Sequence, residues 1–382
     1  MKRDYCIVCG APLLREPIYQ CRDLPAAAQN LPTKENVDND KAIDLDLRQC
    51  EGCGLVQFDC EPVSYYKDST RAGERSRTLI PVCQEQFRHF IENWNLQGKK
   101  ILEIGAGKGG FLKTLEEMDY QVQARGIENS EAFVRIAKEE EGVDVQQGDP
   151  ESTDTEITGA PFDAFYSFAY PARLLNPNAM LQLASKNLKA DGLGLIRVPS
   201  MEHLMKPGGF YDLTVDHIAY YDTNTLHFLL QRNGFDVLEQ GEAGQVYIYA
   251  VVKKREALPL KRIWADVEPL QKQVAAYIRD VVKQGKKIAV WCAGHFAFTL
   301  LSMAGIHHEV SYIIDNASFK QGCFAPGSHI PIVAPSHFQE EPVDEIMILG
   351  PIYVDEIVNE IRTKCASDMV ITTFGRTGIQ KI

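Results

Sequence analysis

The 382-residue sequence contains no apolar run of about 18 residues, the length from which a membrane-spanning helix is suspected. Its first residues, Met1 to Cys6, also lack the apolar core of a secretory signal peptide. Basic residues are in deficit, because 40 Lys and Arg stand against 52 Asp and Glu, a formal net charge of −12. That balance argues against non-specific binding to nucleic acid or to anionic membranes. We therefore expect a cytoplasmic protein without nucleic-acid or membrane partners.

Cysteine is present, but its placement argues against a disulfide framework. Six of the ten cysteines lie in the first 60 residues, and a reducing compartment keeps such thiols free. Two Cys-x-x-Cys knuckles, each followed by a glycine, supply four thiolates, and a closed set of four is typical of structural zinc. The expected Zn²⁺ ligands are Cys6, Cys9, Cys50 and Cys53. Cys21 and Cys60 are reserve ligands, and the alternative is a set of free thiols.

Residues 101–110 read Ile-Leu-Glu-Ile-Gly-Ala-Gly-Lys-Gly-Gly, a strand that runs into a glycine-rich turn. A helical pattern follows at once, and a second strand ends in Glu128. A strand, a glycine-rich turn and a helix N-terminus form the nucleotide cradle of doubly wound α/β folds. An acidic residue after the second strand can accept both hydroxyls of a ribose. The alternative is a turn of the same shape that binds no ligand.

The turn also has an acidic residue in the strand before it. Its form, E-x-G-x-G-x-G, resembles motif I of the class I S-adenosylmethionine (SAM) methyltransferases. SAM has no pyrophosphate, so Lys108 is not expected to hold phosphate there. The expected cofactor-binding residues are Glu103, Gly105, Ala106, Gly107, Gly109 and Glu128. Asp149, Tyr66 and Ser69 are further candidates for the cofactor, against the alternatives of a loop acid and surface packing.

From residue 100 onward, strand and helix patterns alternate, which predicts α/β domains with parallel sheets and helices on both faces. The expected strands are 100–104, 122–127, 143–146, 163–168, 193–198, 235–239 and 245–253. The expected helices are 79–95, 109–118, 130–139, 177–188 and 223–233. We expect a turn at Asp191-Gly192, and Thr223 or Asn224 as the N-cap of the last helix.

A second strand–turn–helix pattern follows the polar stretch 253–256. Helix 262–284 precedes strand 287–292, a turn at 293–295 and helix 296–304, which indicates a smaller Rossmann-like unit. The chain is too long for one ordinary core. The expected domains are an N-terminal zinc-binding domain (1–75), a class I SAM methyltransferase domain (76–255) and a C-terminal Rossmann-like domain (256–382) that binds a nucleotide sugar.

These three parts, in this order, resemble the deoxysugar C-methyltransferases, which act on nucleotide-linked ketosugars. The resemblance spans essentially the whole chain. It rests on Cys50-Glu-Gly-Cys53-Gly-Leu-Val-Gln57, Val198-Pro199-Ser200, Asp216-His217-Ile218-Ala219-Tyr220-Tyr221 and Pro326-Gly327-Ser328-His329-Ile330-Pro331-Ile332. It implies SAM and structural Zn²⁺ as cofactors and a nucleotide-diphosphate sugar as substrate. The candidate sugar-nucleotide contacts are Gly294, His295, Asp315 and Lys320, and we expect a monomer or homodimer.

Methylation of a carbon beside a ketone requires a base for the C–H proton and a donor for the resulting oxyanion. Histidine suits the first task, and in the family that this chain resembles, the residue corresponding to His217 is the base. Asp216 beside it can orient the imidazole or raise its pKa. Tyrosine hydroxyls can donate to an oxyanion, and the candidates are Tyr170, Tyr220 and Tyr221. The alternative for His217 is a buried structural histidine.

The chain departs from the family at two points. The family has Tyr-His-Glu-His where this chain has Thr214-Val215-Asp216-His217, and Tyr170 is the nearest match to a family histidine. Three functions therefore stay open. The leading one is C-methyl transfer to a nucleotide ketosugar. The others are O- or N-methyl transfer to another small molecule, and non-catalytic binding of SAM or a sugar nucleotide.

Overall fold

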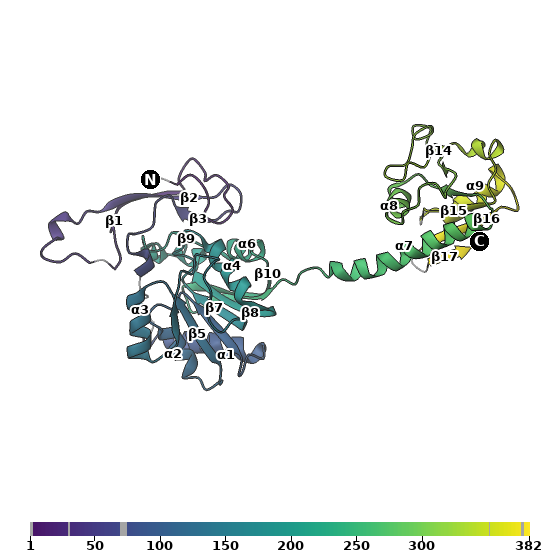
Figure 1. The fold of residues 1–382 in the computed structure, drawn as a ribbon. Helices are drawn as coiled ribbons and strands as arrows, with labels where there is room; N and C mark the ends of the chain where they lie inside the picture. Colours follow the sequence, from purple (N-terminus) through teal and green to yellow (C-terminus); the bar gives the residue numbers. More distant parts are fainter. Residues whose placement is uncertain (1–2, 30, 69–74, 351, 376–377) are drawn as a thin grey trace. The chain divides into compact units, whose positions relative to one another are not determined.

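A computed structural model describes residues 3–29, 31–68, 75–350, 352–375 and 378–382. The chain divides into two compact units, Met1–Glu256 and Ala257–Ile382. Both combine helices with sheets (Figure 1), so the α/β prediction is confirmed. Among the described residues, no helix has both the length and the apolar character needed to cross a membrane.

The main sheet of the first unit has the strand order β10-β11-β8-β7-β4-β5-β6. Its strands are β4 (Lys100–Ile104), β5 (Gln123–Glu128), β6 (Val145–Gln147), β7 (Phe162–Phe168), β8 (Leu188–Pro199), β10 (Phe235–Ala243) and β11 (Tyr247–Lys254). The sheet is mixed rather than wholly parallel, because β11 runs antiparallel to both of its neighbours. A short turn joins β10 to β11, and strands joined in that way must pair antiparallel.

Helices cover both faces of this sheet. They are α1 (Leu79–Asn93), α2 (Gly110–Glu116), α3 (Glu131–Ile136), α4 (Pro177–Asn187) and α6 (Thr223–Arg232). Successive residues of a strand point to opposite faces. Accordingly, Ile101 packs in a cluster with residues of α1, α2 and α3, whereas Leu102 packs in one with residues of α4 and α6. The core of the first unit therefore has two layers, one on each face of the sheet, with Ile101 in one layer and Leu102 in the other.

A smaller sheet connects the N-terminal segment to the middle of the chain. Its order is β1-β2-β3-β9, with strands β1 (Tyr19–Leu24), β2 (Ile43–Gln49), β3 (Val56–Phe58) and β9 (Ala219–Tyr220). Val56 pairs with Tyr220 across β3 and β9. Ile7 and Leu55 lie in the same buried cluster as Phe165 of the main sheet. The N-terminal segment is therefore packed on the core of the first unit, immediately beside His217.

Two local expectations were wrong. The predicted turn at Asp191-Gly192 lies inside β8, where pairing with β7 shifts from Phe162–Leu188 to Ala164–Leu193. The extra residues of β8 form an irregularity within a continuous strand. The N-cap of α6 is Asp222 rather than Thr223 or Asn224. The Asp222 carboxylate accepts from Thr225 N at 2.7 Å, and the Thr225 hydroxyl accepts from Asp222 N at 2.9 Å, a reciprocal capping box.

The second unit is built on one sheet of order β14-β13-β12-β15-β16-β17. Its elements are α7 (Leu260–Lys283), β12 (Ile288–Trp291), α8 (His295–Met303), β13 (Ile313–Ile314), β14 (Ile332–Val333), β15 (Glu345–Ile348), α9 (Val354–Lys364), β16 (Val370–Gly375) and β17 (Gly378–Lys381). All strands except β17 pair in parallel. The chain winds to both sides of β12, so the carboxyl end of β12 is a topological switch point.

Candidate active site and metal centre

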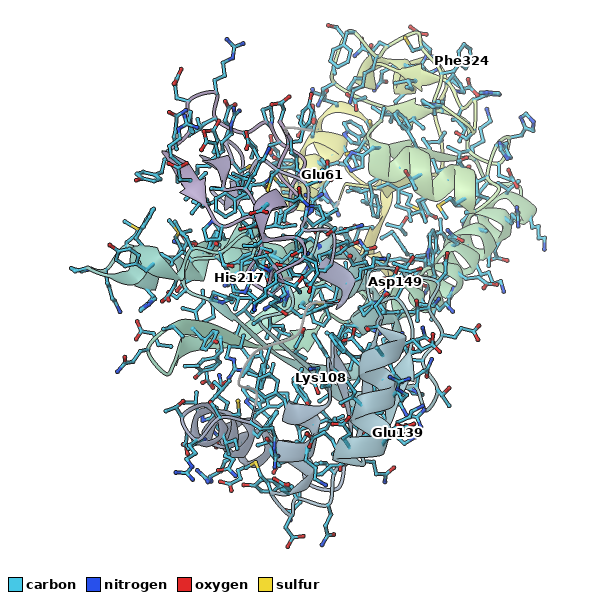
Figure 2. All side chains as sticks on the ribbon, turned by 90° about the vertical axis from the view of Figure 1, so that its left-hand side faces the viewer. Glu61, Lys108, Glu139, Asp149, His217 and Phe324 are labelled. Carbon is cyan, nitrogen blue, oxygen red and sulfur yellow. The ribbon has the colours of Figure 1, made fainter. Side chains whose placement is uncertain are left out.

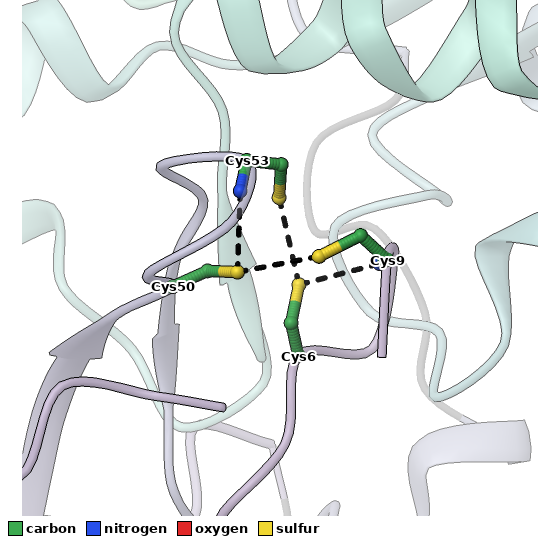
Figure 3. A group of neighbouring side chains, drawn as sticks. All are labelled: Cys6, Cys9, Cys50 and Cys53. Carbon is green, nitrogen blue, oxygen red and sulfur yellow. Dashed lines mark hydrogen bonds between the residues drawn. The ribbon is translucent and has the colours of Figure 1, made fainter. Parts of the chain in front are cut away.

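The four cysteines of the two knuckles converge. Figure 3 shows their sulfur atoms directed at a common centre, and all four lie within 4.8 Å of one another. Cys9 Sγ is 3.3 Å from Cys50 Sγ, and Cys6 Sγ is 3.6 Å from Cys53 Sγ. Tetrahedral zinc with Zn–S bonds of about 2.3 Å requires sulfurs about 3.8 Å apart. The donor set therefore fits a four-thiolate zinc site.

Backbone amides reinforce this fit. In the first knuckle, the N–H groups of Val8 and Cys9 donate to Cys6 Sγ at 3.4 and 3.5 Å. The second knuckle repeats the pattern, with two N–H groups donating to Cys50 Sγ at 3.3 and 3.4 Å. Hydrogen bonds to a charged acceptor are stronger than those to a neutral one. The amides therefore favour thiolates over thiols, as a bound cation does.

A glycine ends each knuckle because the backbone turns into the left-handed region there. Gly10 has φ of 77° and Gly54 has φ of 81°, which a residue with a Cβ rarely adopts. The reserve cysteines Cys21 and Cys60 lie elsewhere, in a hydrophobic cluster around Phe58. A site closed by four cysteines has no open position for a substrate, so its role is structural.

The glycine-rich turn leaves β4 in a conformation that only glycine adopts easily. The left-handed φ values are 75°, 55° and 84° at Gly105, Gly107 and Gly109. A Cβ on Gly105 would lie 2.5 Å from Cγ of Tyr170, so the tyrosine ring packs directly on the turn. The N–H groups of Gly105 and Ala106 donate to Ile127 O, both at 3.0 Å. These bonds fix the turn against the end of β5.

Glu128, the last residue of β5, closes the turn from the other side. Its Oε2 accepts from Gly107 N at 2.8 Å, and its Oε1 accepts from Ser130 N at 3.0 Å. The side chain is only 5% exposed, so these bonds hold it in one orientation. The structure therefore places the Glu128 carboxylate, held in a fixed orientation, directly beside the glycine-rich turn.

The remaining cofactor candidates differ in position. Glu103 is fully buried in β4 and accepts a hydrogen bond from Tyr166 Oη at 3.0 Å. Asp149, labelled in Figure 2, pairs with Lys67 Nζ at 3.0 Å. Lys67 belongs to the short helix Tyr66–Asp68, so Tyr66 is brought next to Asp149. The predicted candidate Ser69 lies outside the described residues.

Acidic groups surround the ring that packs on the turn. Burial first, and then the charge of Glu128, raise the pKa of Tyr170 well above its ordinary value. Glu151 and Asp149 add to the same shift. The negative potential that disfavours a tyrosinate at this place favours a cation, and the sulfonium of SAM is one.

A cavity of about 210 Å³ opens beyond the carboxyl end of β8. Because β8 is separated from β4 only by β7, this cavity lies two strands away from the glycine-rich turn. Its lining includes Ser200, His203, Asp212, His217, Tyr220 and Tyr247. Figure 2 shows His217 beneath the N-terminal strands. Because β4 and β8 both run parallel to β7, the cavity and the glycine-rich turn lie at the same edge of the sheet.

His217 enters this cavity as a neutral imidazole. Its ring stands edge-on to Tyr220, with centroids 6.3 Å apart, and no described residue bonds its Nδ1. Burial, and then the charge of Arg173, lower its pKa to about 3. Of the two roles expected for Asp216, orienting the imidazole or raising its pKa, the second is contradicted by this lowered pKa. A neutral ring is nevertheless the form that can accept a proton.

Asp216 holds the neighbouring segments together instead. Its Oδ1 accepts from Tyr65 Oη at 2.5 Å and its Oδ2 from Gln29 Nε2 at 2.7 Å. Arg173 lies 3.8 Å from the same carboxylate, which is only 4% exposed. Sequence reasoning did not assign these three partners to the site, and Gln29 is 187 positions away, so no local pattern marks it.

The two tyrosines after His217 lie in different surroundings. The hydroxyl of Tyr220 accepts from Thr214 N and donates to Thr214 O, both at 3.0 Å. Tyr221 is fully buried in the core cluster that contains Cys6 and Leu226. Burial raises the pKa of both tyrosines. Tyr220 thus lines the cavity, but its hydroxyl is bonded to the backbone of Thr214. Tyr221 packs in the core.

The candidate sugar-nucleotide contacts in the second unit lie near the ends of β12 and β13. Asp315 Oδ2 accepts from Ala293 N at 2.8 Å and pairs with Lys320 Nζ at 3.0 Å. Gly294 is the N-cap of α8, and His295, its first residue, is exposed. The structure therefore brings Asp315 and Lys320 together next to the N-terminus of α8. Sequence reasoning missed the backbone strain in this turn, a left-handed φ of 90° at Cys292.

Comparisons with known proteins bear on both units. Residues 74–240 match a family model described as a methyltransferase domain, and residues 253–371 match one described as a C-methyltransferase C-terminal domain. The protein is a SAM-dependent methyltransferase. The C-methyltransferase NovU of Streptomyces niveus is 22% identical over 393 residues, which cover 93% of this chain and 91% of NovU.

Solved structures are similar to part of this methyltransferase. A SAM-dependent methyltransferase from Aquifex aeolicus has a TM-score of 0.37 at 16% identity, covering 44% of this chain and 89% of its own. A SAM-dependent methyltransferase from Clostridium acetobutylicum has a TM-score of 0.38 at 12% identity, covering 46% and 92%.

Purified methyltransferase should contain about one zinc per chain, because the four thiolates form a closed set. Metal analysis checks the content, and Cys50→Ser should lose most of it. Chelation should lower the unfolding temperature, since Cys6 and Cys50 share a buried cluster with the main sheet. Cys323→Ser, which changes an exposed cysteine of the second unit, is the matched control and should keep its zinc. Zinc-free protein, or full zinc in Cys50→Ser, would contradict the assignment.

The imidazole of His217 should stay neutral between about pH 8 and 5, because its pKa is lowered to about 3. The NMR shift of its Cε1–H, assigned with His217→Gln, should be flat in that range and move in urea with a midpoint near about 6.5. The folded chain binds this proton less readily than the unfolded one. The contribution of His217 to the free energy of unfolding is therefore greatest above about pH 6.5. It declines as the pH falls from about 6.5 toward 3. A midpoint near 6.5 in the folded protein would refute the shift.

Proposed function

We propose that this methyltransferase transfers a methyl group to a carbon next to the ketone of a nucleotide-diphosphate-linked sugar. The observation that carries the proposal is the position of His217. A neutral imidazole lines a cavity of about 210 Å³, two strands away from the turn that fits the cofactor. The similarity to NovU, a protein named as a C-methyltransferase, and the resemblance to ketosugar C-methyltransferases support a carbon acceptor.

The residues around the turn fit the cofactor. Glu128 would accept from the ribose hydroxyls, the backbone from Gly105 to Gly109 would approach the ligand closely, and Asp149 and Tyr66 would lie on the adenine side. Glu103 would contribute a carboxyl group beneath the turn. Bound SAM supplies an electrophilic methyl group on a positively charged sulfur.

The acceptor needs a group that removes a proton from carbon. We assign this role to His217, whose neutral ring accepts a proton without first losing one. Its low affinity for protons belongs to the protein alone. A diphosphate or an enolate nearby adds negative charge, which favours the protonated ring and raises its pKa toward the useful range. Asp216 positions the segment, and Tyr170 is the next candidate for contact with the reacting atoms.

The second unit, taken by itself, has a place suited to the diphosphate of a sugar nucleotide. A diphosphate is favoured at a helix N-terminus, where N–H groups point outward and the helix dipole is positive. Gly294 and His295 lie at that end of α8, and the ammonium of Lys320 is held close by through Asp315. We propose these four residues as contacts of the sugar nucleotide.

Replacement of Glu128 by alanine should weaken SAM binding by roughly 1.5–3 kcal/mol, the typical contribution of hydrogen bonds to a charged group. Isothermal titration with SAM measures this effect. Glu128→Gln preserves the acceptor for Gly107 N but removes the charge. Its affinity for SAM should therefore lie between that of wild type and that of Glu128→Ala. Glu131→Ala changes an exposed residue of α3 and is the control. Unchanged affinity in Glu128→Ala would mean that the cofactor is held elsewhere.

The carbon acceptor can be tested without methyl transfer. In D₂O with S-adenosylhomocysteine, wild-type enzyme should place deuterium on the carbon beside the ketone of thymidine- or uridine-diphosphate 4-keto-6-deoxyhexoses. His217→Asn should bind the same sugar nucleotide but exchange about 10²–10⁴-fold more slowly, the usual effect of losing a general base. His227→Asn, which alters a histidine bonded to Gln240 outside the cavity, should exchange normally.

Two results would contradict this assignment. Rapid exchange in His217→Asn would transfer the role of base to another group. Methyl transfer by an enzyme that catalyses no exchange would indicate an oxygen or nitrogen acceptor.

A further inference from the structure

A second histidine lines the cavity that contains His217. His203 belongs to the short helix α5 (Met201–Leu204), and its Nε2 lies 2.7 Å from Oδ2 of Asp212. Asp212 ends the 3₁₀ helix η4 (Gly209–Asp212). Both residues line the cavity of about 210 Å³ together with His217. The sequence-based site did not include either of them.

The backbone is shaped to hold this pair. Ser200 caps α5 by accepting from His203 N at 3.2 Å. Gly208 then turns the chain with a left-handed φ of 85°. At Gly209 the next turn packs so tightly that a Cβ would lie 2.1 Å from His203 O. The chain therefore returns on itself between the two helices and delivers the Asp212 carboxylate to the imidazole.

The contact with Asp212 occupies one ring nitrogen of His203 and leaves the other. In the part of the chain that the structure describes, no hydrogen bond engages Nδ1 of His203. The side chain is 21% exposed, so the ring is reachable from the cavity. A carboxylate that accepts from one nitrogen of an imidazole orients the ring. The second nitrogen of His203 is therefore presented to the cavity.

We propose that His203, positioned by Asp212, is a second catalytic residue, which donates a hydrogen bond to the ketone oxygen of the acceptor. This inference rests on the proposed function and assigns the oxygen side of the same reaction. The two histidines of the cavity have opposite environments. His217 lies near the positive charge of Arg173, whereas His203 is paired with the carboxylate of Asp212. Such contrasting environments divide a base from an acid in one site.

The proton and electron balance of the step is simple. The C–H bond beside the ketone breaks, and its proton moves to the neutral ring of His217. The electron pair forms the carbon–carbon double bond of the enolate, and the carbonyl electrons move to oxygen. The N–H of His203 stabilises that oxyanion without giving up its proton. In D₂O the reverse step returns a deuteron to the carbon, so no oxidant, reductant or further reactant is required.

The alternative is that the contact between His203 and Asp212 is only a structural clasp, which fastens α5 to η4 and takes no part in the reaction. His203→Gln separates the two roles, because a glutamine amide can take the place of Nε2 next to Asp212 while nothing takes the place of Nδ1. Asp212→Asn keeps the shape of the contact and removes the charge. Glu202→Gln is the matched control, since Glu202 also fastens α5, through Thr223 N at 3.1 Å, but does not line the cavity.

The experiment measures deuterium exchange into the same 4-keto-6-deoxyhexose nucleotides, with the full chain and without SAM. His203→Gln should exchange about 10²-fold more slowly than wild type, with sugar-nucleotide affinity changed less than about 3-fold. Asp212→Asn should be about 10-fold slower, as for other residues that orient a functional histidine. Glu202→Gln should match wild type. With a ¹³C-labelled ketone, the downfield shift of the bound carbonyl should be reduced in His203→Gln, a signal that a clasp alone would not change.

The outcomes separate the two proposals. If wild-type enzyme exchanges and His203→Gln exchanges at the same rate with an unchanged carbonyl shift, His203 is only a clasp and this inference is overturned. If His203→Gln does not fold, wild-type exchange in Asp212→Asn overturns it equally. If wild-type enzyme itself catalyses no exchange, the proposed function fails and the assignment of His203 fails with it.

Discussion

The carboxylate of Asp216 is the contact on which the arrangement of the first unit depends. A buried carboxylate is destabilising unless it is paired and hydrogen-bonded, and this one is satisfied by Gln29, Tyr65 and Arg173. Two of these partners come from the N-terminal segment and one from the loop after β7. Removing a partner would leave a buried charge uncompensated. The network therefore fixes the segment that carries His217.

The two zinc knuckles also pack against the segment that carries His217. Cys6 and Cys50 share a buried cluster with Ile218 and Tyr221. In addition, β3 pairs with β9, the strand that directly follows Ile218 in the chain. A catalytic imidazole gains from being held by packed elements rather than by a free loop. In this protein the four-cysteine cluster and the cavity lined by His217 are therefore supported by the same packed residues, although a closed zinc site takes no part in chemistry.

The features that sequence alone predicts are local ones. The cysteine knuckles, the strand into the glycine-rich turn and Glu128 lie within short windows, and their spacing reflects the geometry of a single turn or strand end. The N-cap at Asp222 was also local but was missed, because two neighbouring residues compete for the same position. In contrast, the partners of Asp216 come from distant parts of the chain, and a single sequence does not encode such pairs in any visible pattern. His203 and Asp212 meet only because glycines at 208 and 209 fold the chain back, which sequence spacing does not reveal.

The pairing of β3 with β9 also limits how this protein can be divided. A fragment that begins near α1 would retain the glycine-rich turn and the main sheet but would lose the strand beside β9. Ile218 O, which accepts from Phe58 N, and the backbone of Tyr220, which pairs with Val56, would then lose these partners and form an open edge. Open edges of that kind recruit strands from other chains. The N-terminal segment therefore also guards the catalytic unit against aggregation, and a minimal methyltransferase domain cut from this chain would lack that protection.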